Sequence, residues 1–395
     1  RQMCIRDRDS AGDFLQQQST WLATGVSPGP PSLVLPSGMR GTVSAVPGRV
    51  DVIRKLLLLL LLISLAGVWA VQELERRWQE PLVLPADGLP LIVESGESLR
   101  GVARRLHEEG VLPYPDLLIA YGRWTGIDQQ IKRGEYLLSN RMTPLMLLDL
   151  LRSGKVIEYQ VTLPEGITVR RAVEILASQP QLESVLEGPE DARISAMIEP
   201  YTHPEGLFFP DTYQYARNTT DLELLQRAHK KMVEVLALEW QGRSPELPYE
   251  NPYEALVMAS IIERETGLPQ ERGEIAGVFV RRLQKGMRLQ TDPTVIYGLG
   301  LEFDGNLRRS HLTDDSNIYN TYRIAALPPT PIALPGQAAI HAALHPTEGD
   351  ALFFVARGDG GHEFNATLAG HEKAVRQYQL RRKKDYRSSP VVRQK

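Results

Sequence analysis

An uncharged apolar run of 16 residues at 56–71, LLLLLLLISLAGVWAV, restricts the fold of this chain more than any other feature. A helix needs about 20 apolar residues to cross a bilayer; residues 52–53 extend the run, and Arg54 and Lys55 can reach the interface. A buried helix of a soluble domain would need a polar face, which this leucine-rich run lacks. We therefore predict a transmembrane helix over residues 52–72.

The charges on either side of the run predict its orientation. Four cations precede it between residues 40 and 55, whereas acidic and basic residues are mixed at 73–77. Because cytoplasmic flanks carry the excess of Lys and Arg, we expect a cytoplasmic N-terminus and everything after Gln72 outside. A cleaved signal peptide is the alternative, but the run leads directly into charged residues without a convincing small-x-small site.

The first 50 residues are unlike the rest of the chain. They begin with Arg and show neither periodicity nor a targeting pattern. We expect residues 1–50 to be a disordered or artefactual leader, with the true start at Met39 or near Val52. The single cysteine, Cys4, lies in this leader, so the remainder contains no disulfide, zinc ribbon or Cys nucleophile.

The length of 395 residues predicts two or three domains. After a proline-containing linker at 73–90, residues 91–157 show the pattern of a strand, two helices, a strand and a helix, which predicts a small α+β module. Residues 158–380 then predict a larger α+β domain, and 381–395 form a basic tail. The net charge of −3 gives no indication of a nucleic-acid partner.

Two acids lie near the end of a helix expected after Asn251. Asn251 is suited to the N-cap, Pro252 to the first helical position, and Gly267 ends the helix. The apolar residues at positions 257, 258, 261 and 262 lie within about 80° of Glu265 on the helical wheel, whereas Glu263 points about 160° away from it. Burial and the helix C-terminus both raise the pKa of Glu265, and a protonated carboxyl can act as a general acid.

An ion pair is the other interpretation of this acid. Four arginines follow within a short stretch, Arg272, Arg281, Arg282 and Arg288, and structural ion pairs also perturb carboxyl groups. Helix geometry alone therefore leaves the choice between a general acid and an ion-paired acid open.

Polar side chains are concentrated in two later segments. A short strand expected at 287–290 is followed by a helix with Asp292 at its N-cap, which would place Gln290, Thr291 and Asp292 at a strand end, a common location for ligand contacts. The segment 317–322 is dense in hydroxyls and amides. We predict both as contributors to a binding cleft.

The segment EGLFFPDTYQY at 205–215 combines aromatic rings with Glu205 and Asp211. Rings that stack on sugar faces, together with carboxylates that accept from hydroxyls, suit a carbohydrate ligand. Most such rings are core residues, so we predict only the two acids as cleft residues.

A zinc site was also considered. His341 and His345 have i,i+4 spacing, and His362 or His371 could supply a third ligand. No HExxH motif is present and a proline follows His345 directly, so we predict no metal.

Five segments carry a resemblance to a known family: EGLFFPDTYQY, ASIIERET, VFVRRLQKGMRLQTDPTVIYGLG, YNTYRIAALPPTPIALPG and HEFNATLAGH. Together they resemble the MltG (YceG-like) endolytic murein transglycosylases, from about Leu91 to Tyr378. The resemblance implies that the second Glu of the ExET element, Glu265, is catalytic and that no metal or organic cofactor is needed. It implies that 91–157 is LysM-like and contacts glycan, although a spacer remains the alternative, and that 158–380 is the catalytic domain. Expected substrate-binding residues are Gln290, Thr291, Asp292, Asn320, Thr321, Tyr322, Glu205, Asp211 and Asn365.

The implied function is a lyase of the bacterial inner membrane with a periplasmic catalytic domain. It would cut the MurNAc–GlcNAc bond of nascent peptidoglycan strands, leave 1,6-anhydroMurNAc ends and so limit strand length. Peptidoglycan synthases are partners that the family alone implies. Two alternatives remain open at this point: a hydrolase of the same polymer, and a non-catalytic scaffold that binds glycan.

Overall fold

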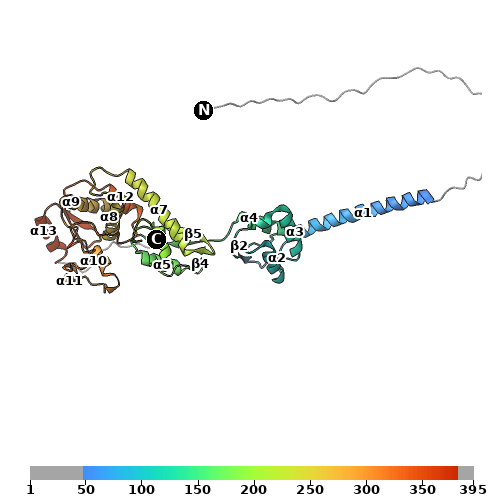
Figure 1. The fold of residues 1–395 in the computed structure, drawn as a ribbon, viewed down its shortest axis with the longest axis horizontal. Coiled ribbons are helices and arrows are strands. Elements are labelled where there is room, and N and C mark those ends of the chain that lie inside the picture. Colours follow the sequence, from blue (N-terminus) through green and yellow to red (C-terminus); the bar gives the residue numbers. More distant parts are fainter. Residues whose placement is uncertain (1–47, 381–395) are drawn as a thin grey trace, which may run out of the picture. The chain divides into compact units, whose positions relative to one another are not determined.

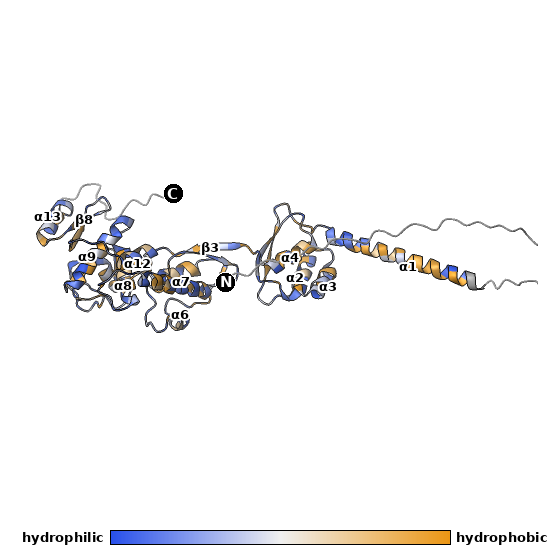
Figure 2. Cartoon of the chain, turned by 90° about the horizontal axis from the view of Figure 1, so that it is seen from above, coloured by the Kyte–Doolittle hydropathy of each residue, from blue (hydrophilic) through white to orange (hydrophobic). Residues whose placement is uncertain are grey.

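A computed structural model describes residues 48–380, and these residues separate into two units between Trp69 and Ala70. The predicted leader, apart from the three residues at 48–50, and the predicted basic tail at 381–395 lie outside the described residues. Helix α1, Gly48–Gln79, is long and apolar enough to cross a membrane. Its side chains from 52 to 71 are exposed, and the apolar stretch is orange in Figure 2.

The helix α1 continues past the predicted span. Glu73 pairs with Arg76 at 2.8 Å and with Arg77 at 2.9 Å, and such i,i+3 and i,i+4 pairs stabilise a helical turn. The linker predicted at 73–90 is therefore helical up to Gln79. Leu82 is then buried in the core of the following module, so this part of the linker is packed rather than free.

The small module that follows has one compact core. Strands β1 (Leu89–Val93) and β2 (Gly134–Leu138) pair antiparallel, with Leu91 opposite Tyr136. Between and after them lie helices α2 (Leu99–Glu108), α3 (Pro115–Thr125) and α4 (Pro144–Ser153), with the short turn η1 (Ile127–Gln129). The order of these elements is the predicted one, while the LysM-like character of the module stays a prediction.

The larger body begins at Glu158 with mixed helices and short two-stranded sheets. Strand β3 pairs antiparallel with β5, β4 parallel with β6, and β7 antiparallel with β8. The elements are β3 (Glu158–Thr162), α5 (Val169–Ala177), β4 (Leu182–Glu183), α6 (Ala192–Met197), β5 (Thr212–Ala216), β6 (Thr219–Thr220), α7 (Asp221–Gln241), α8 (Pro252–Glu265), η2 (Pro269–Glu271), α9 (Arg272–Gln284), α10 (Asp292–Leu299), η3 (Gly300–Glu302), α11 (Arg309–Leu312), α12 (Gln337–Leu344), β7 (Phe353–Ala356), β8 (His362–Asn365) and α13 (Leu368–Tyr378).

Helix α8 lies at the centre of this body. Every residue from 255 to 262 is buried, and α7, α9, α10 and α12 pack around it (Figure 1). Asn251 caps the helix by accepting from the Glu254 amide at 3.0 Å, as predicted. The Glu254 carboxylate accepts from the amide of Glu250 at 2.7 Å. This rigid helix fixes the position of its last residue, Glu265.

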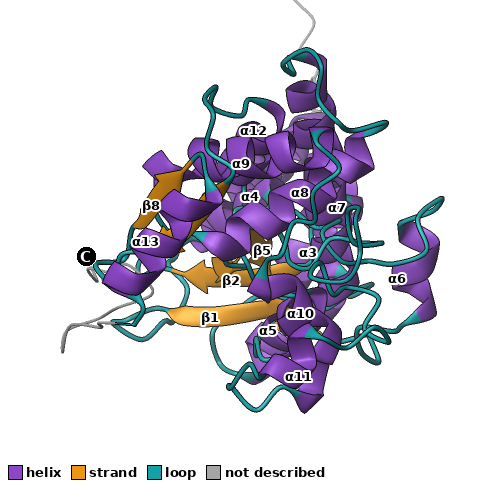
Figure 3. Ribbon diagram, turned by 90° about the vertical axis from the view of Figure 1, so that its left-hand side faces the viewer, coloured by secondary structure: helices purple, strands orange, loops and turns teal. Residues whose placement is uncertain are grey.

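The C-terminal hairpin and helix close one side of the body. Strands β7 and β8 form an antiparallel hairpin, and α13 packs on both strands (Figure 3). One predicted element is wrong: residues 287–290 form no strand. Gln290 has a φ of 52°, in the left-handed region, so the chain turns at the position where a strand would continue.

Candidate active site

Glu265 is the last residue of α8 and faces an open cleft. The chain leaves the helix at Thr266, which has an extended backbone, so the acid stands at the point where the helix stops. The cleft has a volume of about 330 Å³. It is lined by Glu265, Arg282, Leu289, Gln290, Thr291, Asp292, Tyr322, Phe353, Phe354, Leu368 and His371.

The carboxyl of Glu265 has one hydrogen-bond donor and no cation partner. The Thr291 hydroxyl donates to its Oε1. Among residues 48–380 it forms no ion pair: Arg281 and Arg282 donate to backbone carbonyls instead, and Arg272 pairs with Glu263. Burial therefore dominates and raises the pKa of Glu265 to about 6. The ion-pair interpretation of this acid is excluded.

Glu263, two residues earlier, is also buried, with 6% of its side chain exposed. The helical wheel placed it on the far side of α8 from Glu265. It pairs with Arg272 at 3.2 Å and accepts from the Gly336 amide at 3.1 Å. Both acids are therefore buried, and they differ in that Glu263 has a cation partner whereas Glu265 has none among residues 48–380.

A network of threonines holds the donor beside Glu265. The Thr321 hydroxyl accepts from the Thr291 amide at 3.0 Å and lies 2.9 Å from the Thr294 hydroxyl. The Thr294 hydroxyl donates to the Thr291 carbonyl at 2.8 Å. All three residues are buried, so Thr291 has a fixed rotamer and its hydroxyl is aimed at the carboxyl.

Of the predicted binding residues, Gln290, Thr291, Asp292 and Tyr322 line the cleft together with Glu265. The Tyr322 hydroxyl donates to the Asp292 carboxylate at 2.7 Å. This places a second carboxylate in the cleft, and its charge contributes to raising the pKa of Glu265.

Two predicted binding residues are positioning residues instead. Asn320 is fully buried, and its amide donates to the carbonyls of His311, Leu312 and Asp314 at 2.7–3.3 Å. Thr321 is fully buried within the threonine network. Neither side chain has a group available to a sugar, because each holds backbone in place.

Three further predicted residues are not among those lining this cleft. Glu205 lines a separate cavity, where it accepts from the Val169 amide at 2.9 Å and the Tyr297 hydroxyl at 3.1 Å. Asp211 is ion-paired with Lys231 of α7. Asn365 lies in β8, paired with Phe353. The aromatic loop at 205–215 is largely core, as its buried Phe208, Tyr213 and Tyr215 show.

Sequence reasoning did not predict the cleft wall formed by Arg282, Phe353 and His371. Arg282 is buried and donates to the carbonyls of Leu352 at 2.6 Å and Leu289 at 2.7 Å. The His371 ring stacks on Phe353 with centroids 5.3 Å apart, and its Nδ1 has no hydrogen-bond partner among the described residues. Burial lowers the pKa of His371. The sequence signals for this wall were two of the resembling segments, VFVRRLQKGMRLQTDPTVIYGLG with Arg282 and HEFNATLAGH with His371.

The zinc set considered from the sequence does not assemble. His362 is hydrogen-bonded to Glu271 at 2.8 Å, and His371 lines the cleft. His341 and His345 stack with centroids 4.2 Å apart beside Glu239, and the three offer ligand atoms within 4.8 Å of one another. Within the described part of the chain, this is the group with metal-binding geometry, and it does not line the cleft of Glu265.

Comparisons with known proteins find relatives of this chain. A protein from Bacillus subtilis named endolytic murein transglycosylase is 31% identical over 304 residues, which cover 72% of this chain and 83% of that protein. A protein of the same name from Streptococcus pneumoniae is 26% identical over 297 residues, 67% of this chain and 53% of its own length. A crystal structure of a YceG-like protein from Listeria monocytogenes is 27% identical, with a TM-score of 0.46, covering 73% of this chain and 99% of that one.

The match to a protein family covers most of both folded parts. Residues 91–377 match the YceG-like family, from the small module through the Glu265 cleft to α13. The chain spans about half the length of the pneumococcal relative, at 53%, and most of the Bacillus one, at 83%. The family match and the similarity to the Bacillus relative together show that this chain belongs to the YceG-like family.

Proposed function

We propose that this protein is an endolytic peptidoglycan lytic transglycosylase with Glu265 as its acid and base. The observation that carries the proposal is a carboxyl with a pKa of about 6, without a cation partner, facing an open cleft in a chain of the YceG-like family. Relatives in that family are named endolytic murein transglycosylases.

Glu265 in its protonated form donates to the glycosidic oxygen between N-acetylmuramic acid and N-acetylglucosamine. The bond breaks as an oxocarbenium-like state forms at C1. The carboxylate that remains accepts the proton of the muramoyl C6 hydroxyl, whose oxygen closes on C1. The products are a 1,6-anhydro end and a free N-acetylglucosamine 4-hydroxyl. No water is consumed, so one carboxyl serves both steps.

The surroundings of Glu265 suit both protonation states. Burial favours the proton before the reaction, while the Thr291 hydroxyl and the charge of Arg282 favour the carboxylate that follows. Gln290 and Tyr322 line the same cleft and are positioned to hold sugar hydroxyls or N-acetyl groups.

A hydrolase of the same polymer is the second candidate, and Asp292 is the observation that favours it. A two-carboxylate glycosidase needs an acid opposite the general acid, and Asp292 lines the cleft. In that mechanism Asp292 would activate water, and the new end would be a reducing sugar. A non-catalytic glycan-binding scaffold is the third candidate, and it would not depend on Glu265.

The location of the site relative to the membrane belongs to the same proposal. Helix α1 would anchor the protein in the inner membrane with a cytoplasmic N-terminus and the catalytic body in the periplasm. The small module, as a LysM-like unit, would hold glycan near the cleft. An anchored enzyme would cut nascent strands close to the membrane, where peptidoglycan synthases release them.

Mass spectrometry of glycan strands digested by the full chain in detergent tests these alternatives. Wild type is compared with Glu265→Gln and with Glu234→Gln, a control at an exposed acid of α7. The proposal expects anhydro ends from wild type and the control, and none above background from Glu265→Gln. Products heavier by one water would establish the hydrolase. Strand binding without cleavage by any of the three would favour the scaffold.

A further inference from the structure

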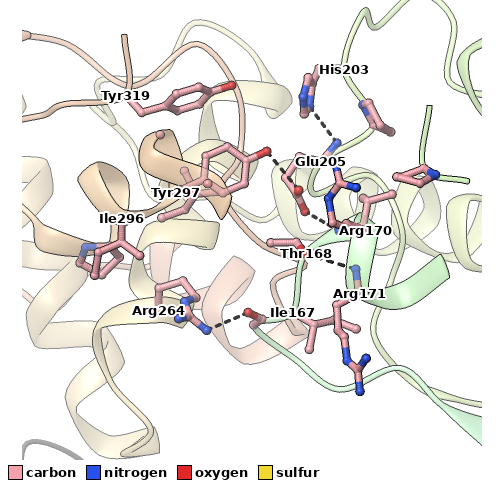
Figure 4. Close-up of a pocket in the computed structure, with 18 of the residues that line it drawn as sticks. Ile167, Thr168, Arg170, Arg171, His203, Glu205, Arg264, Ile296, Tyr297 and Tyr319 are labelled. Carbon is pink, nitrogen blue, oxygen red and sulfur yellow. Dashed lines mark hydrogen bonds between the residues drawn. The ribbon is translucent and has the colours of Figure 1, made fainter. Parts of the chain in front are cut away.

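A second and larger cavity lies in the catalytic body. It has a volume of about 600 Å³ (Figure 4). Its walls come from the loop before α5, the first turn of α5, the segment 203–205, the end of α8 and the helix α10. The residues that matter here are Arg170, Arg171, Arg264, Glu205, Tyr297 and Tyr319.

This cavity adjoins the Glu265 cleft at two points of the chain. Arg264 lines the cavity and Glu265 the cleft, and likewise Pro293 lines the cavity and Asp292 the cleft. Consecutive Cα atoms are about 3.8 Å apart, so only the last turn of α8 and the first of α10 separate the two spaces. The end of α8 and the start of α10 therefore contribute walls to both the cavity and the cleft.

Three guanidinium groups give the cavity a positive rim. Arg170 lies 3.9 Å from Glu190 and Arg171 2.8 Å from Glu174, and all four side chains are about half exposed or more. Exposed ion pairs of this kind are weak, so each arginine can leave its glutamate for a ligand carboxylate. Arg264 donates to the Gly166 carbonyl at 3.0 Å and lacks a carboxylate partner among residues 48–380. Arginine binds carboxylates through two parallel hydrogen bonds.

The interior of the cavity is partly apolar. Tyr297 and Tyr319 meet edge to face with ring centroids 4.9 Å apart, and Ile296 and Ile332 are among the other lining residues. Glu205 lies behind Tyr297 and accepts from its hydroxyl, as Figure 4 shows. Burial raises the pKa of Glu205 to about 7, and the three arginines outnumber the two acids of the lining, Glu190 and Glu205.

We propose that this cavity binds the short peptide attached to the glycan strand, with Arg170 and Arg171 holding its carboxylates and the tyrosine-lined interior holding its small aliphatic side chains. The inference rests on the proposed function, because it assumes that the strand occupies the Glu265 cleft. Murein peptides combine free carboxylates with methyl-bearing residues, which is the chemistry that this lining complements. The peptide would then fix the register of the strand relative to Glu265.

Binding by the inactive full chain tests the proposal without requiring turnover. In the Glu265→Gln background, dissociation constants are measured for strands that carry peptides and for the same strands after an amidase has removed them. The double variant Arg170→Glu, Arg171→Glu should bind peptide-bearing strands about tenfold or more weakly, the loss of roughly one charge-assisted contact. Its affinity for stripped strands should not change.

The matched control is Lys230→Glu, which reverses an exposed cation of α7 that pairs with Glu234. It should leave both affinities unchanged. Equal weakening for peptide-bearing and stripped strands, or no change for either, would overturn the peptide site. The absence of anhydro products from the wild type in the separate digestion experiment would instead contradict the proposed function, so the two failures are distinguishable.

Discussion

The two acids in the last turn of α8, Glu263 and Glu265, point into different surroundings. Glu263 points into packed protein, where Arg272 and the Gly336 amide satisfy its carboxylate. Glu265 points into a cleft and receives one hydroxyl, from Thr291. Burial raises the pKa of both, but only Glu265 combines a retained proton with access to a ligand.

The difference shows how one helix supports both stability and chemistry. An acid beside a buried cation is held as a structural ion pair. Removing the acid leaves the cation buried without a counter-charge. A buried acid without a cation partner destabilises the fold when it ionises. Acids of this kind are found at functional sites, where the raised pKa is used in the chemistry. Exchanging each acid for its amide separates the two roles.

The largest effect is expected on catalysis. Glu265→Gln removes the transferable proton, and general acid–base catalysis contributes about 10²- to 10⁴-fold to a rate. Glu263→Gln should retain a rate within about tenfold of wild type, because Glu263 does not line the cleft. Initial rates of strand cleavage at pH 6 give the comparison. A larger loss from Glu263→Gln than from Glu265→Gln would reverse the assignment.

The next effect is on stability at pH 7. Glu263→Gln leaves Arg272, of which 11% is exposed, with only Glu165 at 3.6 Å. We expect a loss of about 2 to 3 kcal/mol in the free energy of unfolding, somewhat below the usual cost of breaking a buried pair. Denaturant unfolding measures it. Glu234→Gln, at an exposed acid, is the control and should stay near wild type.

A smaller effect of opposite sign is expected for Glu265→Gln. The folded protein raises the pKa of Glu265 from 4.5 to about 6. The folded state therefore binds this proton more tightly than the unfolded state, and stability is lost as pH rises from 4.5 through 6. The amide variant avoids this loss, so it should exceed wild type by up to about 2 kcal/mol at pH 8 and by little at pH 4.5. Equal differences at both pH values would contradict the raised pKa.

The smallest effect concerns Thr291. Its hydroxyl donates to the Glu265 carboxylate and so holds the pKa of that acid below the value that burial alone would give. Thr291→Val keeps the shape and the backbone amide but removes this donor, which should raise the pKa and move the loss of activity to higher pH. A rate profile between pH 4.5 and 8 shows the shift. A shift toward lower pH would mean that the hydroxyl does not stabilise the carboxylate.

Much of this arrangement could be predicted from sequence because it is local. Asn251-Pro252 and the apolar spacing of α8 predicted its start and the burial of Glu265. The bounds of α5, α7, α9 and α12 were likewise predictable to within a few residues. These features depend on capping and periodicity, which act over a few neighbouring positions.

Features that depend on distant segments were not predictable. The helical wheel showed Glu263 on the opposite side of α8 but could not show that Gly336 and Arg272 cover that side. Asn320 was expected to contact sugar because its amide is polar, whereas the fold uses it to hold three carbonyls of the preceding loop. Arg282 and His371 reach the cleft from α9 and α13, and no local pattern connects those helices to Glu265.

The pH dependence of product formation tests the central claim most directly. Anhydro ends are counted by mass spectrometry after digestion at pH 4.5 to 8 by wild type, Glu263→Gln and Glu265→Gln. We expect wild type and Glu263→Gln to lose kcat/KM as pH rises through about 6, the pKa of Glu265, and Glu265→Gln to stay at background throughout. Anhydro ends from Glu265→Gln with the wild-type pH dependence would contradict the claim, because a different group would then supply the proton.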